Sequence, residues 1–539
     1  TKRQAWERIF IAIILTALIL TPIIKHVTLI YAQSQGAITS PIFEPGTQIE
    51  TASYIIFREG DTYYAKNGST GEIEFSGTDA SQVVQYALDS GDKVFIKSGV
   101  YLLKSYTYTV KDGSYVILAL DSNSSLIGEG RGNTILKVDF SASGRVDIIG
   151  VKNGTITNIR VSSLTIDGNY QNINVDYQCG IRTASYGNVS NVLLDNLEVK
   201  NCKDFGIYIT NQLGYITEKV EITNNFVHHN RRGNIGVGYG TRLVTISGNV
   251  VWKAIACSVD ENFGYPIFEG SGISVYDGAY EWSITGNIVY ENDYQGIRVG
   301  AARKGTITGN TIYKNGLVDN ATHVTKVSGG IFVFRGEEIT ISGNYIDYTQ
   351  NAYDGILIYG DSHRITITGN TIAHNTGKGI RLYWFNSSWY PHDIVISSNE
   401  LYANYVGIRL NRARNVTISS NLIHGCSGTA LEFVYSQNIK FNDNYLYDND
   451  ALANFDSNTN LNFNHNYGFT TENSGNATIS SSTSVTFEHG LAGTPTHVEV
   501  GWKDTGYGDW KWTANSTHIT ITVTNSGTYS FSWYAEYKP

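Results

Sequence analysis

The chain has 539 residues, of which 16% are charged, and its formal net charge is −9. This acidic balance gives no basic footprint for a nucleic acid, so we expect no nucleic-acid partner. The 7 prolines and 55 glycines favour uninterrupted strand ladders joined by tight turns. The 4 cysteines show no C-x-x-C spacing, which argues against a zinc site of that kind and leaves buried thiols or one disulfide as alternatives.

The N-terminal segment has the pattern of an export signal. Lys2, Arg3 and Arg8 precede an apolar run over 9–24, and a second apolar stretch follows at 27–32. A cationic flank before an apolar core is typical of a secretory signal, and the second stretch would let the segment act as an uncleaved anchor. We predict a signal peptide or membrane anchor at 1–32, a linker at 33–52, and a secreted or cell-surface protein that contacts a membrane only through this segment.

Residues 53–90 have the pattern of a cap. Residues 53–77 alternate like strands, and Asp79 can cap a short helix that carries apolar Val83, Val84, Ala87 and Leu88 on one side. The apolar end of a solenoid must be covered by a capping unit. We therefore predict that 53–90 covers the first coil of such a structure.

One short phrase recurs through the middle of the chain. It reads ITNN, ISGN, ITGN or ISSN, and its last residue falls at Asn225, Asn249, Asn287, Asn310, Asn344, Asn370, Asn399 and Asn421. Further copies end at Asn196, Asn444 and Asn466, and the intervals from Asn399 onward are 22, 23 and 22 residues. A fixed period of this size indicates a solenoid.

Each repeat unit has the alternation of short strands. Apolar and polar residues alternate around the Asn phrase, and a second alternating run opens with Gly, as in GIRV at 296–299 and GILI at 355–358. The leucine positions and helices of leucine-rich repeats are absent. The pattern predicts an all-β, single-stranded parallel β-helix over 91–472, in which each Asn side chain bonds to the coils on either side.

The repeats stop near residue 473, and 473–539 carry alternating runs, Gly-rich turns and four Trp residues. We predict a small C-terminal antiparallel β-sandwich there. Its role would be a cap, an oligomerisation unit or a sugar contact. Its Trp residues would form the core or, alternatively, a sugar-binding platform.

Three segments in order carry a family resemblance: DASQVVQYALD at 79–89, VFIKSGVY at 94–101 and LIGEGRGNTIL at 126–136. Together with the repeats they resemble the pectate-lyase-like superfamily of right-handed parallel β-helices, over about residues 75–468. Polysaccharide lyases, glycoside hydrolases, epimerases and tailspikes share this fold. The resemblance implies a polysaccharide ligand, makes Ca²⁺ a candidate cofactor and makes a homotrimer a candidate assembly.

The outward side of the Gly-opened strands is the expected functional face. Aligned on Gly, these strands place one outward column at Tyr208, Ser274, Arg298, Phe332, Leu357, Arg381, Arg409 and Glu432. A second column holds Thr210, Tyr276, Gly300, Phe334, Tyr359, Tyr383, Asn411 and Val434. Because neighbours in a column lie one coil apart, the aromatic residues should form one open surface.

Exposed aromatic rings fit sugar faces, and arginine forks fit carboxylates or hydroxyls. An exposed apolar patch of that extent usually marks a binding site. The alternative is that loops cover the rings. The predicted polysaccharide-binding residues are Arg298, Phe332, Phe334, Tyr359, Tyr383, Trp384, Trp389 and Arg409.

Catalysis would need carboxylates or an imidazole beside this surface. Hydrolysis uses two carboxylates, whereas lyase or epimerase chemistry uses a base with a cation that stabilises the developing charge. YPHD at 390–393 is similar to the D-P-H-D/E motif of mannuronan C5-epimerases and related alginate lyases, with Tyr390 in place of the leading Asp. The similarity implies that His392 is the catalytic imidazole and Asp393 the following acid.

The full set of catalytic candidates is Asp354, Asp361, His363, Arg381, His392 and Asp393. An ion pair between Asp354 and Lys378 is the structural alternative for Asp354, and a solvated turn residue is the alternative for each carboxylate. We expect an exported polysaccharide-binding protein that acts as a lyase or hydrolase. The rival expectation is a non-catalytic adhesin or spike, which the absence of polygalacturonase-type motifs favours.

Overall fold

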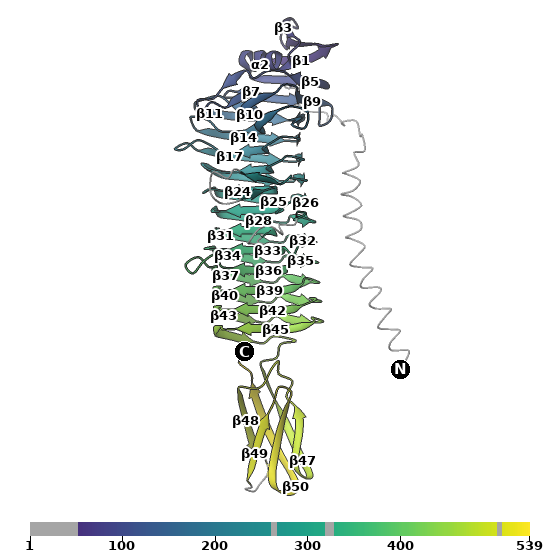
Figure 1. Cartoon of the computed structure of the whole chain (residues 1–539), viewed down its shortest axis with the longest axis vertical. Coiled ribbons are helices and arrows are strands. Elements are labelled where there is room, and N and C mark those ends of the chain that lie inside the picture. Colours follow the sequence, from purple (N-terminus) through teal and green to yellow (C-terminus); the bar gives the residue numbers. More distant parts are fainter. Residues whose placement is uncertain (1–51, 260–266, 319–327, 504–508) are drawn as a thin grey trace, which may run out of the picture. The chain divides into compact units, whose positions relative to one another are not determined.

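The described part of the chain is almost entirely β-structure wound into stacked coils. The structure, a computed structural model, describes residues 52–259, 267–318, 328–503 and 509–539. The predicted signal or anchor at 1–32 and most of the linker lie outside these residues. No helix in the described ranges is long and apolar enough to cross a membrane. Figure 1 shows the strands of successive coils stacked on one another.

A typical coil contributes one strand to each of three sheets, named here A, B and C. Sheet C consists of β6 (Tyr108–Thr109), β7 (Tyr115–Leu120), β10 (Ala142–Val151), β13 (Val175–Arg182), β16 (Phe205–Ile209), β19 (Gly233–Val237), β24 (Ser271–Tyr276), β27 (Ile297–Gly300), β30 (Gly329–Phe334), β33 (Asp354–Tyr359), β36 (Lys378–Tyr383), β39 (Val406–Asn411), β42 (Thr429–Val434) and β45 (Ala451–Asp456). The Gly-opened runs predict seven of these strands: β16, β24, β27, β30, β33, β36 and β39.

Sheet A follows sheet C in each coil. It consists of β1 (Tyr54–Glu59), β2 (Thr62–Asn67), β3 (Ile73–Gly77), β4 (Lys93–Ile96), β8 (Ser125–Gly128), β11 (Ile156–Ser162), β14 (Val189–Asp195), β17 (Thr217–Thr223), β20 (Thr241–Ser247), β25 (Tyr280–Thr285), β28 (Arg303–Thr308), β31 (Glu337–Ser342), β34 (His363–Thr368), β37 (His392–Ser397), β40 (Arg414–Ser419), β43 (Gln437–Asn442) and β46 (Thr459–Asn464).

Sheet B closes the coil. It consists of β5 (Gly99–Leu103), β9 (Thr134–Val138), β12 (Thr165–Asp167), β15 (Glu198–Lys200), β18 (Phe226–His228), β21 (Val250–Trp252), β26 (Ile288–Tyr290), β29 (Thr311–Tyr313), β32 (Tyr345–Asp347), β35 (Thr371–Ala373), β38 (Glu400–Tyr402), β41 (Leu422–His424) and β44 (Tyr445–Tyr447). A separate antiparallel pair, β22 (Cys257–Val259) and β23 (Ile267–Glu269), lies in the insertion after β21. The strands of neighbouring coils pair in parallel, which confirms the parallel β-helix.

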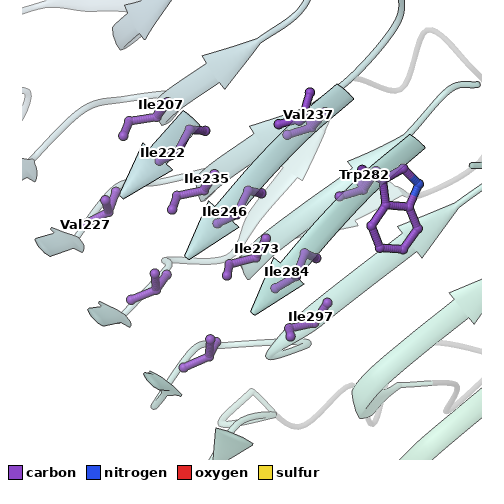
Figure 2. Packing of buried hydrophobic residues seen from close by; sticks show 14 of the residues in the cluster. Ile207, Ile222, Val227, Ile235, Val237, Ile246, Ile273, Trp282, Ile284 and Ile297 are labelled. Atoms are coloured by element: carbon purple, nitrogen blue, oxygen red, sulfur yellow. The ribbon is translucent and has the colours of Figure 1, made fainter. Parts of the chain in front are cut away.

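Inward side chains of successive coils form continuous apolar columns. Figure 2 shows two of them, Ile207, Ile235, Ile273 and Ile297 from sheet C and Ile222, Ile246 and Ile284 from sheet A. Trp282 takes the register position of Val244, and the next coil has Gly305 there, where a Cβ would lie 2.1 Å from the indole ring. The glycine therefore leaves the volume that the larger ring fills.

The recurring Asn residues form a hydrogen-bonded ladder at the corner between sheets A and B. Asn344 donates from Nδ2 to Asn370 Oδ1 and to the Ile307 carbonyl, both at 2.9 Å. Its Oδ1 accepts the backbone N–H and the Nδ2 of Asn310, at 3.0 and 2.9 Å. The backbone bonds of this pattern run from Asn225 to Asn466. The predicted ladder is confirmed, and the buried amides are satisfied.

The copy of the phrase that ends at Asn196 was assigned one residue too early. Leu197 is buried in the ladder position and donates its backbone N–H to Asn225 Oδ1 at 2.9 Å. Asn196 has a φ of 55° and bonds instead to Ser163. In the preceding coil the ladder position is held by buried Leu164. Leu164 has no side-chain amide, so it needs no acceptor from residue 197, and an apolar residue fits there.

Gly opens the sheet C strands because the backbone there closely approaches the strand of sheet B that follows in the same coil, which is β35 in the case of Gly355. A Cβ on Gly355 would lie 2.5 Å from Ile372 Cγ2 and 2.9 Å from Asn375 Nδ2. Asn375 belongs to a second set of buried amides, at the corner between sheets B and C, and it bonds to Asn404 at 2.8 Å. A side chain at 355 would therefore displace both the core and this amide.

The N-terminal cap contains the predicted helix, α2 (Ala80–Ser90). Asp79 caps it by accepting the Ser81 N–H at 2.9 Å, and Val83, Val84, Ala87 and Leu88 are buried. The helix therefore covers the end of the apolar interior as expected.

The C-terminal strands form an antiparallel sheet with a core of its own. β47 (Glu472–Glu488) pairs with β50 (His518–Glu536), and β48 (His497–Trp502) and β49 (Trp510–Ala514) pair with different parts of β50. Trp533 belongs to the core and Trp502 packs against it, whereas Trp512 is 39% exposed. The predicted antiparallel unit is confirmed, and most of its Trp residues serve packing.

Candidate functional site

From Arg298 onward the outward columns of sheet C run as predicted, whereas β19 places Gly236 between Tyr208 and Ser274, a coil that the sequence alignment missed. The first contains, in successive coils, Arg298, Phe332, Leu357, Arg381, Arg409 and Glu432, and the second contains Gly300, Phe334, Tyr359, Tyr383 and Asn411. Their inward neighbours, such as Ile331 and Val333, belong to the main core, which fixes the phase of the strands. The predicted residues are therefore brought together on one outer face.

The aromatic surface at the middle of this face is less open than predicted. Phe332 and Tyr359 are each 7% exposed, and Leu357 is fully buried between them. Tyr383 stacks on Tyr359, with ring centroids 5.9 Å apart and planes at 11°. Rings one coil apart in a column are close enough to cover one another. The expectation of open rings is therefore wrong for Phe332 and Tyr359, and these rings act as an apolar floor.

A loop over residues 384–391, here called the aromatic loop, covers part of this floor and supplies the accessible rings. Phe385 is 45% exposed, and its ring centroid lies 5.7 Å from that of Tyr359 and 6.0 Å from that of Phe334. Trp389 packs against Phe385 with centroids 5.4 Å apart. The accessible aromatic surface therefore lies on the loop and not on the strands.

Three arginines from other coils stack on rings of the aromatic loop. They are Arg335 on Trp389 at 4.8 Å, Arg412 on Trp384 at 4.0 Å and Arg414 on Tyr390 at 4.0 Å from the ring centroid. These three are called the loop arginines below. Within the described residues, none of the loop arginines has a carboxylate partner within ion-pair distance. Arg414 NH1 donates to Tyr390 Oη at 2.7 Å, and its other N–H groups, like those of Arg335 and Arg412, can donate to an anionic ligand.

The arginines of the first column are already paired with acids. Arg381 NH1 lies 3.5 Å from Asp354 Oδ2, and its guanidinium lies 3.9 Å from the Tyr383 ring centroid. Arg409 Nε lies 3.3 Å from Glu432 Oε2, and Arg298 NH1 lies 3.8 Å from Glu269 Oε1. Such pairs hold the guanidinium groups in place and neutralise part of their charge.

Asp354 is a buried positioning group. It is 1% exposed, its Oδ1 accepts the Lys378 backbone N–H at 2.8 Å, and its ion-pair partner is Arg381. Burial raises the pKa of Asp354 against the opposing charges of Arg381 and Lys378. Burial likewise lowers the pKa of Lys378, whose ammonium lies 5.8 Å from the Tyr405 ring centroid. Asp354 is thus suited to fixing Arg381 rather than to meeting a ligand.

The other predicted catalytic residues gather where sheet C turns into sheet A. His363 and His392 begin consecutive strands of sheet A and stack with centroids 4.8 Å apart and planes at 5°. Asp361 Oδ1 lies 3.5 Å from His392 Nε2, and His392 Nδ1 is hydrogen-bonded to Asp393 Oδ2 at 2.8 Å. The Asn415 and His392 hydrogen bonds lower the pKa of Asp393. Four candidates that are separated in sequence thus form one cluster.

A second group of charged residues, on earlier coils of sheet C, was missed. Asp204 is 1% exposed and lies 3.5 Å from Arg232 and 3.6 Å from Arg145. Arg182 bonds to buried Asp147 at 3.2 Å, and burial raises the pKa of Asp147. The signal was present, because 180–182 read Gly-Ile-Arg like 379–381 and 407–409. Because each charged residue in this second group has an ion-pair partner, we interpret the group as a structural network.

The three cysteines whose side chains are described, Cys179, Cys202 and Cys426, are buried free thiols. Burial raises the pKa of each of these thiols. They are therefore apolar packing residues and take no part in the surface just described.

The fold and this surface define a parallel β-helix protein with an arginine- and aromatic-rich outer face. A family model described as a right handed beta helix region matches residues 243–388 and 384–492. The chain is thus a right-handed parallel β-helix protein.

Solved structures agree on the fold. The A-module of mannuronan C-5 epimerase AlgE4 from Azotobacter vinelandii is 16% identical, with a TM-score of 0.53 over 66% of this chain and 93% of that chain. The A-module of AlgE6 from the same organism is 17% identical, with a TM-score of 0.52 over 71% and 95%. The tailspike gp61 of Pseudomonas phage phi297 is 11% identical, with a TM-score of 0.48 over 84% and 91%. At these identities the likeness to the two epimerase modules, whose TM-scores exceed 0.5, establishes the fold alone.

Proposed function

We propose that this protein binds an acidic extracellular polysaccharide on its aromatic loop and the adjoining outer face of sheet C. The observation that carries the proposal is the set of loop arginines, each stacked on an aromatic ring and none paired with a carboxylate within the described residues. A stacked guanidinium keeps its N–H fork for a sugar carboxylate, and exposed Phe385 offers an apolar face for a sugar ring. This combination favours an acidic glycan over a neutral one.

The likeness to two proteins named as mannuronan C-5 epimerases supports a polysaccharide ligand, because mannuronan is itself a polysaccharide. A secreted or cell-surface location, with the 1–32 segment as signal or anchor, belongs to the same proposal. A homotrimer is retained as the candidate assembly.

For catalysis, the geometry favours proton abstraction, as in a lyase, over hydrolysis. Hydrolysis needs two carboxylates that face the substrate. Asp354 is buried and engaged by Arg381 and Lys378, and Asp393 is engaged by His392 and Asn415, which leaves Asp361 as the one free candidate carboxylate among the described residues. An imidazole is present instead: His392 lies next to the aromatic loop and is oriented by Asp393. A neutral imidazole can act as the base. The alternative is a non-catalytic adhesin that uses the same surface for attachment.

Binding is tested with acidic and neutral polysaccharides presented to wild type and to Trp389→Ala and Phe385→Ala. An aromatic contact contributes about 1 kcal/mol, so each substitution should weaken binding of the acidic glycan about fivefold. Tyr445→Ala is the matched control, because Tyr445 is 43% exposed but lies in sheet B. Equal losses in the control and the two loop variants would overturn the proposed location.

Catalysis is tested by following unsaturated uronate products and new reducing ends with the same acidic glycans. We expect unsaturated products from wild type and at least a hundredfold slower formation in His392→Ala. Retained glycan binding without either kind of product would establish the adhesin alternative.

A further inference from the structure

The cluster at the turn from sheet C to sheet A has the composition of a metal site. Asp361, His363 and His392 each place one donor atom within 4.8 Å of the others. All three side chains are partly exposed, at 45%, 21% and 29%. An ion could therefore enter from solvent. The residues come from two consecutive coils, so the fold and not the local sequence brings them together.

The hydrogen bonds of His392 fix which ring nitrogen is available. Its Nδ1 is 2.8 Å from Asp393 Oδ2, so Nδ1 carries the proton and donates it to the carboxylate. Nε2 is then the ring nitrogen left to face a ligand, and it lies 3.5 Å from Asp361 Oδ1. Asn415 Nδ2 in turn donates to Asp393 Oδ1 at 2.9 Å. Metal-binding histidines almost always have such a carboxylate on the second nitrogen.

His363 is uncommitted by hydrogen bonds. Its Nδ1 is buried without a partner within the described residues, and its Nε2 is 3.8 Å from Glu337 Oε1, which is beyond hydrogen-bond range. The two imidazoles stack with their centroids 4.8 Å apart. An imidazole without a hydrogen bond therefore lies directly beside one whose Nε2 faces a carboxylate, and both can turn a nitrogen toward a shared ion.

The surrounding charge also favours a cation. Glu337 and Asp393 add two carboxylates beside Asp361, and the nearby Arg364 bonds to Glu337 rather than to the three donors. A small rotation of each partly exposed ring is required, because donors around a tetrahedral ion with bonds of about 2.1 Å lie about 3.4 Å apart.

We propose that Asp361, His363 and His392 bind one divalent transition-metal ion of the zinc type. Two imidazole nitrogens and one carboxylate oxygen suit Zn²⁺ or Co²⁺ and not Ca²⁺, which takes six to eight oxygen ligands. Three protein ligands leave one coordination position for water or a ligand oxygen. The site rests on these three residues alone and does not depend on the proposed glycan surface. Because Nδ1 of His392 bonds to Asp393, a metal ion on Nε2 would occupy the nitrogen proposed as the base, so His392 acts as a base only in the metal-free chain.

The test is titration of the metal-free full chain with Co²⁺, read by visible absorption, and with Zn²⁺, read by calorimetry. We expect one ion per chain and the intense absorption of tetrahedral Co²⁺. Affinity should fall at least a hundredfold in His363→Ala and His392→Ala and about tenfold in Asp393→Asn. His424→Ala is the matched control, because His424 Nε2 is 3.6 Å from Glu400 in sheet B, while its ring neighbours among the described residues are Tyr402 and Tyr447 and not a second histidine.

Three outcomes would overturn the proposal: no binding of either ion at millimolar concentration, an equal loss in the control variant, or stoichiometric binding of Ca²⁺ alone. Thermal unfolding of each variant shows whether the fold is intact, and a variant that unfolds early is replaced by His392→Gln. Because the readout is metal binding, a failure of the glycan assay leaves this result unaffected.

Discussion

The Asn ladder predicts a large loss of stability from a single amide, and Asn344→Ala is the sharpest perturbation. The substitution removes four hydrogen bonds, of 2.9 to 3.0 Å, and leaves the Asn310 N–H without its acceptor and the Ile307 carbonyl without its amide donor. Each buried polar group left unsatisfied costs about 1–3 kcal/mol. We therefore expect a loss of about 3–5 kcal/mol, a large share of a typical domain's stability.

The matched control is Asn438→Ala, in a second row of Asn residues on the surface. Asn438 donates to Asn415 at 2.9 Å and accepts from Asn460 at 2.6 Å, but all three are exposed. Water can replace these bonds, but Asn438 has a φ of 57°, which Ala adopts only with strain, so the expected loss is about 1–2 kcal/mol and stays below that of Asn344→Ala. Asn344→Leu separates volume from hydrogen bonding: it fills the site as Leu197 does elsewhere, yet it still leaves Asn310 without an acceptor.

The assay is urea unfolding together with hydrogen exchange of the segment around Asn310. A loss of about 3 kcal/mol corresponds to exchange roughly a hundredfold faster at the affected amide. Equal effects of Asn344→Ala and Asn438→Ala, or full protection in Asn344→Leu, would refute the reasoning that buried amides hold the coils together.

Two further predictions concern an ion pair and a glycine. Burial acts to raise the pKa of Glu198, but hydrogen bonds from His228 and Lys200 outweigh it and lower the pKa from 4.5 to about 2. A lowered carboxyl pKa stabilises the fold above pH 4.5, and this contribution, roughly 3 kcal/mol, is lost as the pH falls from 4.5 to about 2. Glu198→Gln should therefore remove this part of the pH dependence of stability, measured by urea unfolding at a series of pH values. An unchanged pH dependence would contradict the prediction. Gly355→Ala would place a Cβ 2.5 Å from Ile372 Cγ2, so we expect the free energy of unfolding to fall by about 1–3 kcal/mol, measured by thermal unfolding. An unchanged stability would contradict this and show that the coil can expand.

The coil architecture could be predicted because it depends on local, repeated features. The Asn phrase and the Gly-opened runs recur once per coil, and each marks a position that the backbone requires in every coil. The assignment at Asn196 failed because an Asn next to a Leu satisfies the same short pattern in two registers, and only the neighbouring coil, through Asn225 Oδ1, distinguishes them.

The site was predicted in position but not in exposure. Register follows from the repeat, so the columns that contain Phe332 and Tyr359 were placed correctly. Their burial depends on how the aromatic loop folds back, and on contacts such as Phe385 against Tyr359 that no repeat encodes. The stacking of the loop arginines was likewise invisible in the sequence, because ring and guanidinium come from different coils.

The most direct test of the central claim is hydroxyl-radical footprinting of the chain with and without a bound acidic polysaccharide. The account predicts that the glycan protects Phe385 and Trp389 on the aromatic loop and leaves Trp512, which is 39% exposed in the C-terminal sheet, unchanged. Protection of Trp512 with no change at Phe385 and Trp389 would contradict it and place glycan recognition in the C-terminal sheet.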